Sequence, residues 1–353
     1  MHPQLDLTEW DLANRDTSLI IADGANVSVN VHSGVLVIKD GPMGDARERR
    51  FARVPRTVKH LAILCTHGFL SLDAQAWLYD CDITWSVIDR SGKLPRTLST
   101  SARYTDPTLM RRQASCAPGM PGWYTGVRIN RHLIEVKLEG QADNCERILR
   151  DTEASKAILA LRDRVRVSRS LDTILGLEGN AADVYWDAWR SLPLVWRRPL
   201  PKQAHWLVYP SRKTLRMGWE TNRHATDPIN AALNFGYKAA ETECTLACYA
   251  VNLSPAMGIA HVDRTGRDSF ALDLLEVMRP RVDAIILGVM AERLIKANFW
   301  EDKEGIVRVS APLTHRIISE VHAERYAIAQ ALFTVISHLN DIKGKGKPRV
   351  DSK

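Results

Sequence analysis

The sequence has no long apolar run. No stretch reaches the roughly 20 consecutive apolar residues that a membrane-spanning helix needs. The amino terminus, MHPQLDLTEW, has no basic segment followed by an apolar one, so no signal peptide is indicated. We therefore expect a cytoplasmic protein that is not inserted in a membrane.

Several signatures of nucleotide and nucleophilic chemistry are also missing. There is no phosphate-binding P-loop and no glycine run typical of dinucleotide binding. No Ser-His-Asp or Cys-His arrangement indicates a nucleophilic enzyme. The cysteines have no paired C-x-x-C spacing, which argues against a zinc site built from them. The six are Cys65, Cys81, Cys116, Cys145, Cys244 and Cys248. We expect them to be reduced and mostly buried.

What the chain does have is length and positive charge. Its 353 residues exceed the size of most single hydrophobic cores, so two domains are expected. The content of 45% hydrophobic and 25% charged residues is typical of a globular protein. The formal net charge of +7 and the isoelectric point near 9.1 favour a polyanionic partner without identifying it.

The order of the local patterns predicts an α+β fold. Apolar and polar residues alternate from Val27 to Val31, and a second apolar stretch at 35–38 follows Gly34, which together predict a β-hairpin. After about residue 107 helical periods replace the strand pattern. The other elements predicted are strands at 61–65 and 83–89, a short helix at 71–79, a loop at 40–50 and a late hairpin at 305–309.

This order also predicts the domains. We expect a β-rich amino-terminal domain at 1–95, a linker at 96–106, and a larger all-α domain at 107–340. Residues 341–353 contain KGKGKPR and no apolar cluster, so a basic, disordered tail is predicted there.

A helix, a loop and a second helix are predicted between residues 227 and 280. Asp227 is suited to cap the first helix, and a proline follows it. A loop interrupted by proline and glycine then carries His261. On the second helix Asp273 and Glu276 are three residues apart, so both carboxylates project from one face and can converge on one cation. Such a pair is more often a solvated acidic face, so a metal site needs further support.

That support comes from Glu178. This residue stands beside Gly179 in LGLEGNAADVYWDAW, ahead of an apolar and aromatic helix face where a structural role for a carboxylate is hard to find. A histidine with convergent carboxylates is a donor set for a divalent metal. Oxygen ligands suit Mg²⁺ or Mn²⁺, and an imidazole shifts the preference toward Mn²⁺.

A basic and aromatic segment, 196–223, lies between these stretches. In one interpretation its cations neutralise DNA phosphates while Trp206, Tyr209 and Trp219 stack on unpaired bases. In the other it is an ordinary basic loop whose aromatic residues anchor it to the core. The candidate DNA-binding residues in this segment and beside the acidic pair are Arg197, Arg198, Arg212, Lys213, Arg223, Arg279 and Arg281. In the alternative interpretation, any one of Arg223, Arg279 and Arg281 caps a helix or pairs with a carboxylate.

Several of these stretches resemble one family. Glu-Gly followed by alanines and a tyrosine, then DPINAALNFGY, NLSPAMGIAH and RDSFALDLLEVMRP, are similar in order and content to CRISPR-associated protein one, the integrase that inserts new spacers into CRISPR arrays. RINRHLIEVKLEGQADNCERIL, which contains Lys137 and Gln141, resembles the first long helix of that family's catalytic domain. HGFLSLDAQAWLYDCDITWSVIDRSGKL resembles the segment that closes its amino-terminal domain. The resemblance covers nearly the whole chain.

The resemblance implies a metal-dependent DNA endonuclease and integrase. It puts the family's metal-binding glutamate at Glu178, its histidine at His261 and its acidic pair at Asp273 and Glu276, and it leaves open which of the pair binds Mg²⁺ or Mn²⁺ directly. The implied reaction is a transesterification in which a DNA 3′-hydroxyl attacks a phosphodiester at the edge of a CRISPR repeat. The helical domain would be catalytic, the β-rich domain would pair in a homodimer, and CRISPR-associated protein two would bridge dimers on double-stranded DNA.

Two other functions would use the same fold. One is a structure-specific DNA nuclease, or a mobile-element integrase outside CRISPR, with the same metal site. The other is a noncatalytic DNA-binding scaffold, which the presence of Glu178, His261, Asp273 and Glu276 disfavours.

Overall fold

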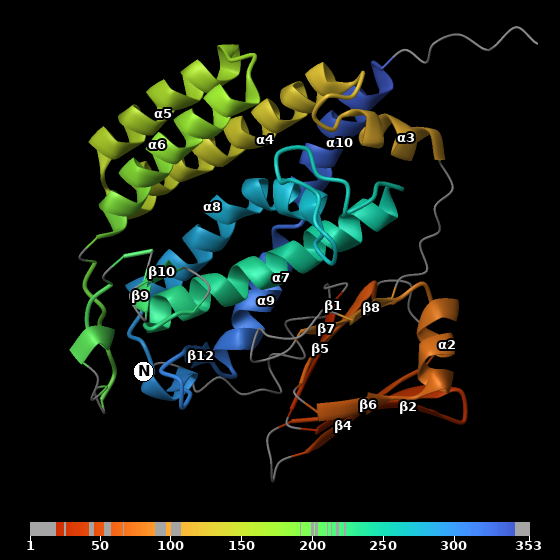
Figure 1. Cartoon of the computed structure of the whole chain (residues 1–353). Helices are drawn as coiled ribbons and strands as arrows, with labels where there is room; N and C mark the ends of the chain where they lie inside the picture. Colours follow the sequence, from red (N-terminus) through yellow and green to blue (C-terminus); the bar gives the residue numbers. More distant parts are fainter. Residues whose placement is uncertain are drawn as a thin grey trace, which may run out of the picture.

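The computed structural model has strands in its amino-terminal part and mostly helices afterwards, so the predicted α+β fold is confirmed (Figure 1). The described residues are 19–24, 26–41, 46–52, 58–65, 67–88, 97–99, 107–190, 192–198, 201, 204–209, 211–212, 214–216, 219–221 and 224–342. Among them, no helix combines the length and hydropathy needed to cross a bilayer.

The amino-terminal part contains two four-stranded sheets. The first has the order β1-β5-β7-β8, with β1 (Leu19–Asp23), β5 (His60–Leu64) and β7 (Thr84–Ile88) parallel and β8 (Thr97–Ser99) antiparallel. The second has the order β4-β3-β2-β6 and consists of β2 (Asn26–His32), β3 (Val35–Asp40), β4 (Arg47–Phe51) and β6 (His67–Leu70). The strands β2 and β3 form the predicted hairpin. Helix α2 (Leu72–Asp80) begins after Ser71, whose hydroxyl accepts the Ala74 amide at 3.1 Å.

The first sheet is buried on both faces. In β5, Leu61 and Ile63 belong to the core shared with the second sheet and α2. Ala62 and Leu64, which point to the opposite face, belong to the core of the helical part. A strand covered on both sides needs no polar alternation, and this explains the continuous apolar sequence of β1 and β5.

The predicted loop at 40–50 is wrong in its carboxy-terminal half. Strand β4 begins at Arg47 and pairs with β3. Arg47 and Arg49 form ion pairs with the buried carboxylate of Asp40 at 3.1 and 2.7 Å, so two charged residues of β4 point toward the interior of the domain. A strand whose inward residues are arginines has no apolar period to reveal it.

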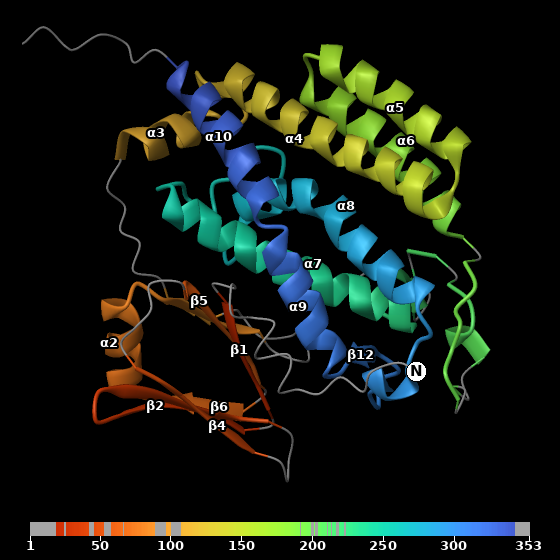
Figure 2. The ribbon, with the colours of Figure 1, turned by 180° about the vertical axis from the view of Figure 1, so that it is seen from behind.

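The helical part is a layered assembly. Helices α4, α5 and α6 pack on one another, α4 also packs on α8, and α8 packs on α7 (Figures 1 and 2). Its helices are α3 (Pro107–Ser115), α4 (Trp123–Asn144), the π-helix η2 (Cys145–Leu149), α5 (Thr152–Val167), α6 (Leu171–Trp189), α7 (Pro228–Ala250), α8 (Ser269–Ala291), α9 (Leu313–Ala323) and α10 (Tyr326–Asn340). Shorter elements are η3 (Ala204–Trp206), β9 (Thr214–Arg216), β10 (Trp219–Thr221), η4 (Lys296–Asn298), β11 (Phe299–Glu301) and β12 (Val307–Val309). The pairing of β11 with β12 confirms the predicted late hairpin.

The predicted domain boundaries stay predictions. Strand β8 falls within the stretch 96–106 that was expected to be a linker, and it pairs with β7 of the first sheet. Helix α10 ends at Asn340, and residues 343–353 of the expected basic tail lie outside the described residues.

Helices α4 and α8 meet closely at Gly140. A Cβ atom placed there would lie 2.6 Å from Cγ of Pro280, so a side chain at this position would force the helices apart. Pro280 lies inside α8, and the Asn144 amide donates to its carbonyl at 2.8 Å. The contact fixes the register of the two helices, and these helices carry Lys137 and Glu276.

Candidate metal centre

Asp273, on α8, holds the loop that carries His261. Its side chain is only 1% exposed. Oδ2 accepts the backbone amides of Ile259 at 2.6 Å and Ala260 at 3.3 Å, and Oδ1 accepts the amide of His261 at 3.0 Å and its ring Nδ1 at 2.7 Å. A carboxylate accepts, so Nδ1 carries the proton. In the neutral imidazole the other ring nitrogen, Nε2, then keeps its lone pair for a ligand.

Lys137, on α4, joins Glu178 on α6 to Glu276 on α8. Its ammonium donates to Oε2 of Glu276 at 2.6 Å and forms an ion pair with Glu178. Nε of Arg279 donates to Oε1 of Glu276 at 2.9 Å. Burial opposes ionisation of Glu276, but the charges of Arg279 and Lys137 outweigh it and lower the pKa to about 2. Burial also opposes the charged form of Lys137, which by itself would lower its pKa. The negative charges of Glu276 and Glu178 have the larger effect, so the pKa of Lys137 is raised.

The donor atoms are of the kinds that a divalent cation binds. The ammonium of Lys137 already places a positive charge between the two carboxylates, which shows that this position accepts a cation. The atoms able to bind one are the oxygens of Glu178 and Glu276 and Nε2 of His261, a set compatible with Mg²⁺ or Mn²⁺. Both oxygens of Asp273 are already used by the 259–261 loop.

The four predicted residues do not form one compact cluster. Two pairings are seen instead, Glu178 with Glu276 through Lys137, and His261 with Asp273. In the part of the chain that the structure describes, only one group of three or more metal-binding side chains has all its ligand atoms within 4.8 Å of one another. That group is His60, Glu243 and His322.

Asp283 is a useful reference on the same helix. It is fully buried and accepts the hydroxyl of Tyr237. Burial raises its pKa to about 6, although hydrogen bonds from Tyr237 and Tyr185 act in the opposite direction. A buried carboxylate of α8 thus stays hard to ionise when its direct partners are hydroxyl groups.

The candidate DNA-binding residues have different surroundings. Arg197 and Arg198 are exposed, so both are accessible to a phosphate. Lys213 and Arg223 lie outside the described residues. DNA binding by any of them stays a prediction.

The other three candidates are half-buried and bonded within the chain. Arg212 donates to the side-chain oxygens of Asn230 at 2.9 Å and Asn234 at 2.8 Å. Arg281 donates to Glu324 at 2.6 Å. Arg279 is the partner of Glu276 described above. Contact with DNA would require these groups to exchange or share their present partners.

The aromatic residues of segment 196–223 support the anchoring interpretation. Trp206 and Tyr209 are buried, with exposed fractions of 1% and 0%. The Trp206 ring stacks on Trp196 with centroids 6.2 Å apart, and the Trp196 indole donates to the Trp206 carbonyl at 3.0 Å. Such rings are not available to stack on bases. The side chain of Trp219 lies outside the described residues.

One partner of the acidic residues was not predicted from the sequence. Lys137 was noted only as part of a resembling helix, because its pairing with Glu178 and Glu276 joins separate helices and leaves no local pattern. Arg279 was expected either to contact DNA, to cap a helix or to pair with a carboxylate, and the structure shows it paired with Glu276, three residues away on the same helix.

Residues 20–323 match the family model described as CRISPR associated protein Cas1. The chain is 26% identical over 310 residues to the CRISPR-associated endonuclease Cas1 1 of Archaeoglobus fulgidus, a match that covers 82% of this chain and 83% of that protein.

Two solved structures are similar in fold. A casposase bound to integration product superposes with a TM-score of 0.72 at 22% identity, covering 93% of this chain and 92% of that one. A chain of a Cas6-RT-Cas1–Cas2 complex has a TM-score of 0.65 at 16% identity, covering 93% of this chain and 35% of that one. At these identities the likeness concerns the fold. The family match extends over most of the sequence and confirms the resemblance, so the chain belongs to the Cas1 family of CRISPR-associated proteins.

Proposed function

We propose that this chain is a CRISPR adaptation integrase and DNA endonuclease, which inserts short DNA fragments into a CRISPR array by metal-dependent attack of DNA 3′-hydroxyls on phosphodiesters. The observation that carries the proposal is the convergence of Glu178 and Glu276 on one positive charge, in a chain that matches the Cas1 family from 20 to 323. Because its substrate would be cellular DNA, we place it in the cytoplasm.

Glu178, His261 and Glu276 are the proposed metal ligands. Glu276 is preferred over Asp273 because its partners are side chains that can move, whereas Asp273 is bonded to three successive backbone amides. Asp273 is then a positioning residue that fixes the tautomer and orientation of His261. The carboxylates and the imidazole suit Mn²⁺ and Mg²⁺, and the imidazole favours Mn²⁺.

The chain's own residues prepare the site for transesterification. A divalent cation held there would polarise the scissile phosphate and lower the pKa of the attacking 3′-hydroxyl. Arg279 holds the Glu276 carboxylate from the side away from Lys137. Lys137 has to give up its position between the two carboxylates, and its ammonium is then available to an anionic phosphate oxygen. The exchange of one phosphodiester for another needs no nucleotide triphosphate.

Double-stranded DNA is the proposed partner, as protospacer and as CRISPR repeat. The net charge of +7 and exposed Arg197 and Arg198 favour such a polyanion. We further propose a homodimer that pairs through the β-rich domain and is bridged by CRISPR-associated protein two, since a structurally similar chain occurs in a complex whose name includes Cas2.

A strand-transfer assay tests this function. Purified protein is mixed with Mn²⁺ or Mg²⁺, a labelled duplex with free 3′-hydroxyls, and a supercoiled plasmid that carries a CRISPR repeat, with and without Cas2. Label should join the plasmid, and a 3′-dideoxy end should abolish joining. Glu178→Ala and Glu276→Gln should each reduce joining by roughly 100-fold or more, the scale of a lost metal ligand.

Glu153→Ala is the matched control. Glu153 is also a glutamate paired with a lysine, Lys156, but both side chains are exposed, so strand transfer should remain near the wild-type rate. Nicking without joining, also with Cas2 present, would replace the integrase with a nuclease. Joining at the wild-type rate by Glu178→Ala would refute catalysis at this site.

A further inference from the structure

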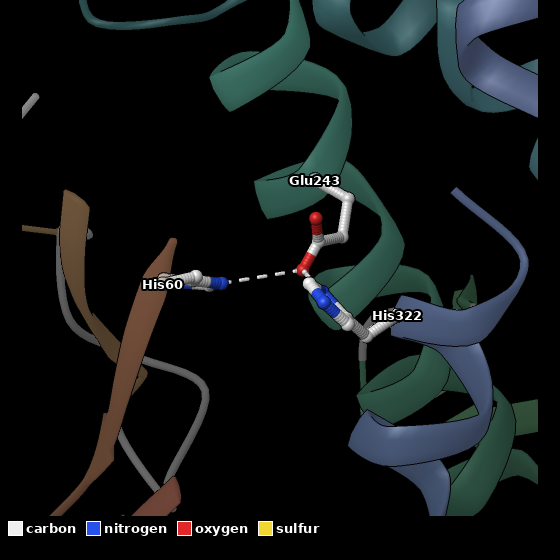
Figure 3. Close-up of side chains that lie close together, drawn as sticks. All are labelled: His60, Glu243 and His322. Atoms are coloured by element: carbon white, nitrogen blue, oxygen red, sulfur yellow. Dashed lines mark hydrogen bonds and ion pairs between the residues drawn. The ribbon is translucent and has the colours of Figure 1, made fainter. Parts of the chain in front are cut away.

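A second group of metal-binding side chains lies between the amino-terminal sheet and the helical part. His60 comes from β5, Glu243 from α7 and His322 from α9, and their side chains point toward one another (Figure 3). We call these three residues the interdomain cluster. Their exposed fractions are 4%, 8% and 3%. A carboxylate buried with two histidines is costly unless its negative charge is balanced by a positive one.

The spacing of the three side chains fits one metal ion. Nδ1 of His322 lies 2.9 Å and Nδ1 of His60 lies 3.3 Å from the same oxygen, Oε1 of Glu243. All three ligand atoms lie within 4.8 Å of one another. Tetrahedral zinc has bonds of about 2.0–2.2 Å, which puts neighbouring ligand atoms roughly 3.3 Å apart. Small shifts of the side chains would therefore suffice to enclose an ion.

The His60 ring is oriented as a ligand would be. Its Nε2 bonds Oγ of Ser86, on β7, at 2.8 Å, and Ser86 is fully buried. Its Nδ1 is also buried and makes no hydrogen bond of acceptable geometry, although Glu243 is near. If Nε2 donates to Ser86, Nδ1 presents an unshared lone pair to the interior of the cluster. A hydrogen bond from the far nitrogen is what usually orients a metal-binding imidazole.

The charge of the cluster also favours a cation. Burial disfavours ionisation of Glu243, but its contacts with His322 and His60 outweigh this, so its pKa is lowered well below the usual range. The buried carboxylate is thus negative when a positive partner faces it. Its charge can be balanced by a protonated imidazole or by a divalent cation, and the cation is the choice that uses both lone pairs at once.

The cluster lies in the wall of a cavity. All three residues line a cavity of about 1000 Å³, whose wall also includes Ala247 and Tyr326. An ion can enter by this route, and the cavity leaves room for water as a fourth ligand.

We propose that His60, Glu243 and His322 bind a divalent cation of borderline softness, Zn²⁺ being the best fit, which ties the amino-terminal sheet to helices α7 and α9. Two imidazoles and one carboxylate are a typical zinc donor set. The residues differ from those of the candidate metal centre. Because the ligands come from both the amino-terminal sheet and the helical part, a bound ion stabilises the packing of the two, by a free energy that rises with the logarithm of its affinity.

Cobalt substitution tests the proposal without relying on activity. Full-length, tag-free Glu178→Ala protein is stripped with chelator and titrated with Co²⁺ and Zn²⁺; this background weakens ion binding at the candidate metal centre. The expected results are visible absorption bands of tetrahedral Co²⁺, one Zn²⁺ per protomer by elemental analysis, and a rise of several degrees in the unfolding midpoint with Zn²⁺. Adding His322→Ala should remove all three.

Two further variants guard against a folding defect. Glu243→Gln keeps the side-chain shape and should also lose the bands, with its far-ultraviolet circular dichroism unchanged. His315→Ala is the matched control, because His315 is another buried histidine that pairs across the same boundary, with Asp23. It should lower stability but keep the Co²⁺ bands and the zinc stoichiometry.

The opposite results would overturn the site. These are Co²⁺ bands that survive His322→Ala and Glu243→Gln, or a stripped protein that binds no Zn²⁺ and shows no thermal shift. In the second case the cluster would be an ion pair between a protonated imidazole and the Glu243 carboxylate.

Discussion

The candidate metal centre and the interdomain cluster both combine histidine with carboxylate, and they differ in their source of positive charge. At the candidate metal centre, Lys137 supplies a permanent charge to Glu178 and Glu276. In the interdomain cluster the partners of Glu243 are two imidazoles, which are charged only when protonated. A site with its own ammonium can be stable without an ion. A site with imidazoles alone has to acquire a proton or a metal.

Two carboxylates on α8 also differ in whether a positive charge lies next to them. Glu276 pairs with Lys137 and Arg279, and its pKa is lowered to about 2 despite burial. Asp283 accepts a hydroxyl from Tyr237, and its pKa is raised to about 6 by burial. The direct partner, more than the depth of burial, decides whether a carboxylate of this helix is ionised.

The largest effect is expected from Lys137→Met. This change removes the ammonium from the candidate metal centre, which then lacks a permanent positive charge, as the interdomain cluster does. Glu276 and Glu178 would lose the charge between them, and without divalent metal the free energy of unfolding should fall by about 3–5 kcal/mol, the scale for breaking a buried ion pair. Mn²⁺ should restore much of the loss. Urea denaturation with chelator and with Mn²⁺ measures both values.

The control for this change is Lys156→Met. Lys156 pairs with Glu153 on the surface, so its loss should change the free energy of unfolding by less than about 1 kcal/mol. Equal effects of the two substitutions would contradict the role given to Lys137.

A smaller effect is expected from Asp283→Asn, which tests the hydroxyl-paired carboxylate. A carboxyl whose pKa is raised by folding favours the native state while protonated. Its contribution is complete below the unfolded value of 3.8 and is lost as the pH rises through about 6. In chelator, the difference in unfolding free energy between wild type and variant should therefore fall by about 3 kcal/mol over this interval. A difference that is constant with pH would show that folding does not raise the pKa of Asp283.

The smallest of the three effects is expected from Asp273→Asn. An amide cannot both accept every donor of the 259–261 loop and keep Nδ1 of His261 protonated. Metal affinity should fall by roughly 10- to 100-fold, the usual range for an orienting partner, with folding retained. Calorimetric titration with Mn²⁺ gives the affinity.

Asp263→Asn is the matched control for that change. Asp263 lies close by in the same loop, but its carboxylate accepts the backbone amide of Gly258 at 2.7 Å, whereas Nδ1 of the His261 ring bonds Asp273. The Asp263→Asn change should therefore leave Mn²⁺ affinity unchanged. Loss of affinity in both variants would indicate that the loop as a whole, and not the Asp273 carboxylate, sets the binding.

The sequence predicted the elements whose pattern is local. The hairpin of β2 and β3, helix α2 and the long α7 and α8 follow from alternation, capping and helical periods. Strand β4 was missed because its inward side chains are arginines, whose target, the buried Asp40, is recognisable only after the sheet has formed.

The sites were predictable to the extent that one segment contains them. Asp273 and Glu276 were identified from their spacing on one helix, His261 from the loop before that helix, and Glu178 from its place ahead of an apolar and aromatic helix face. The family resemblance then assigned all four to one metal site. The different roles of Asp273 and Glu276 were not predictable from spacing. Asp273 is held by three backbone amides of the 259–261 loop, and the Glu276 carboxylate is bonded to side chains. The interdomain cluster escaped prediction altogether. Its members come from β5, α7 and α9, and none of them belongs to a local motif.

The contact of Gly140 with Pro280 makes two positions of the chain depend on each other. A side chain at 140 meets the proline ring at 2.6 Å, so an alanine there is tolerable only if residue 280 becomes smaller or α8 moves. Lys137 is one turn of α4 away from Gly140, and Glu276 is one turn of α8 away from Pro280. A substitution at position 140 or 280 that moves the helices would therefore shift the Lys137 ammonium relative to the Glu276 carboxylate. A larger residue at position 140 thus requires a compensating change at position 280 if the distance between the two charged groups is to be kept.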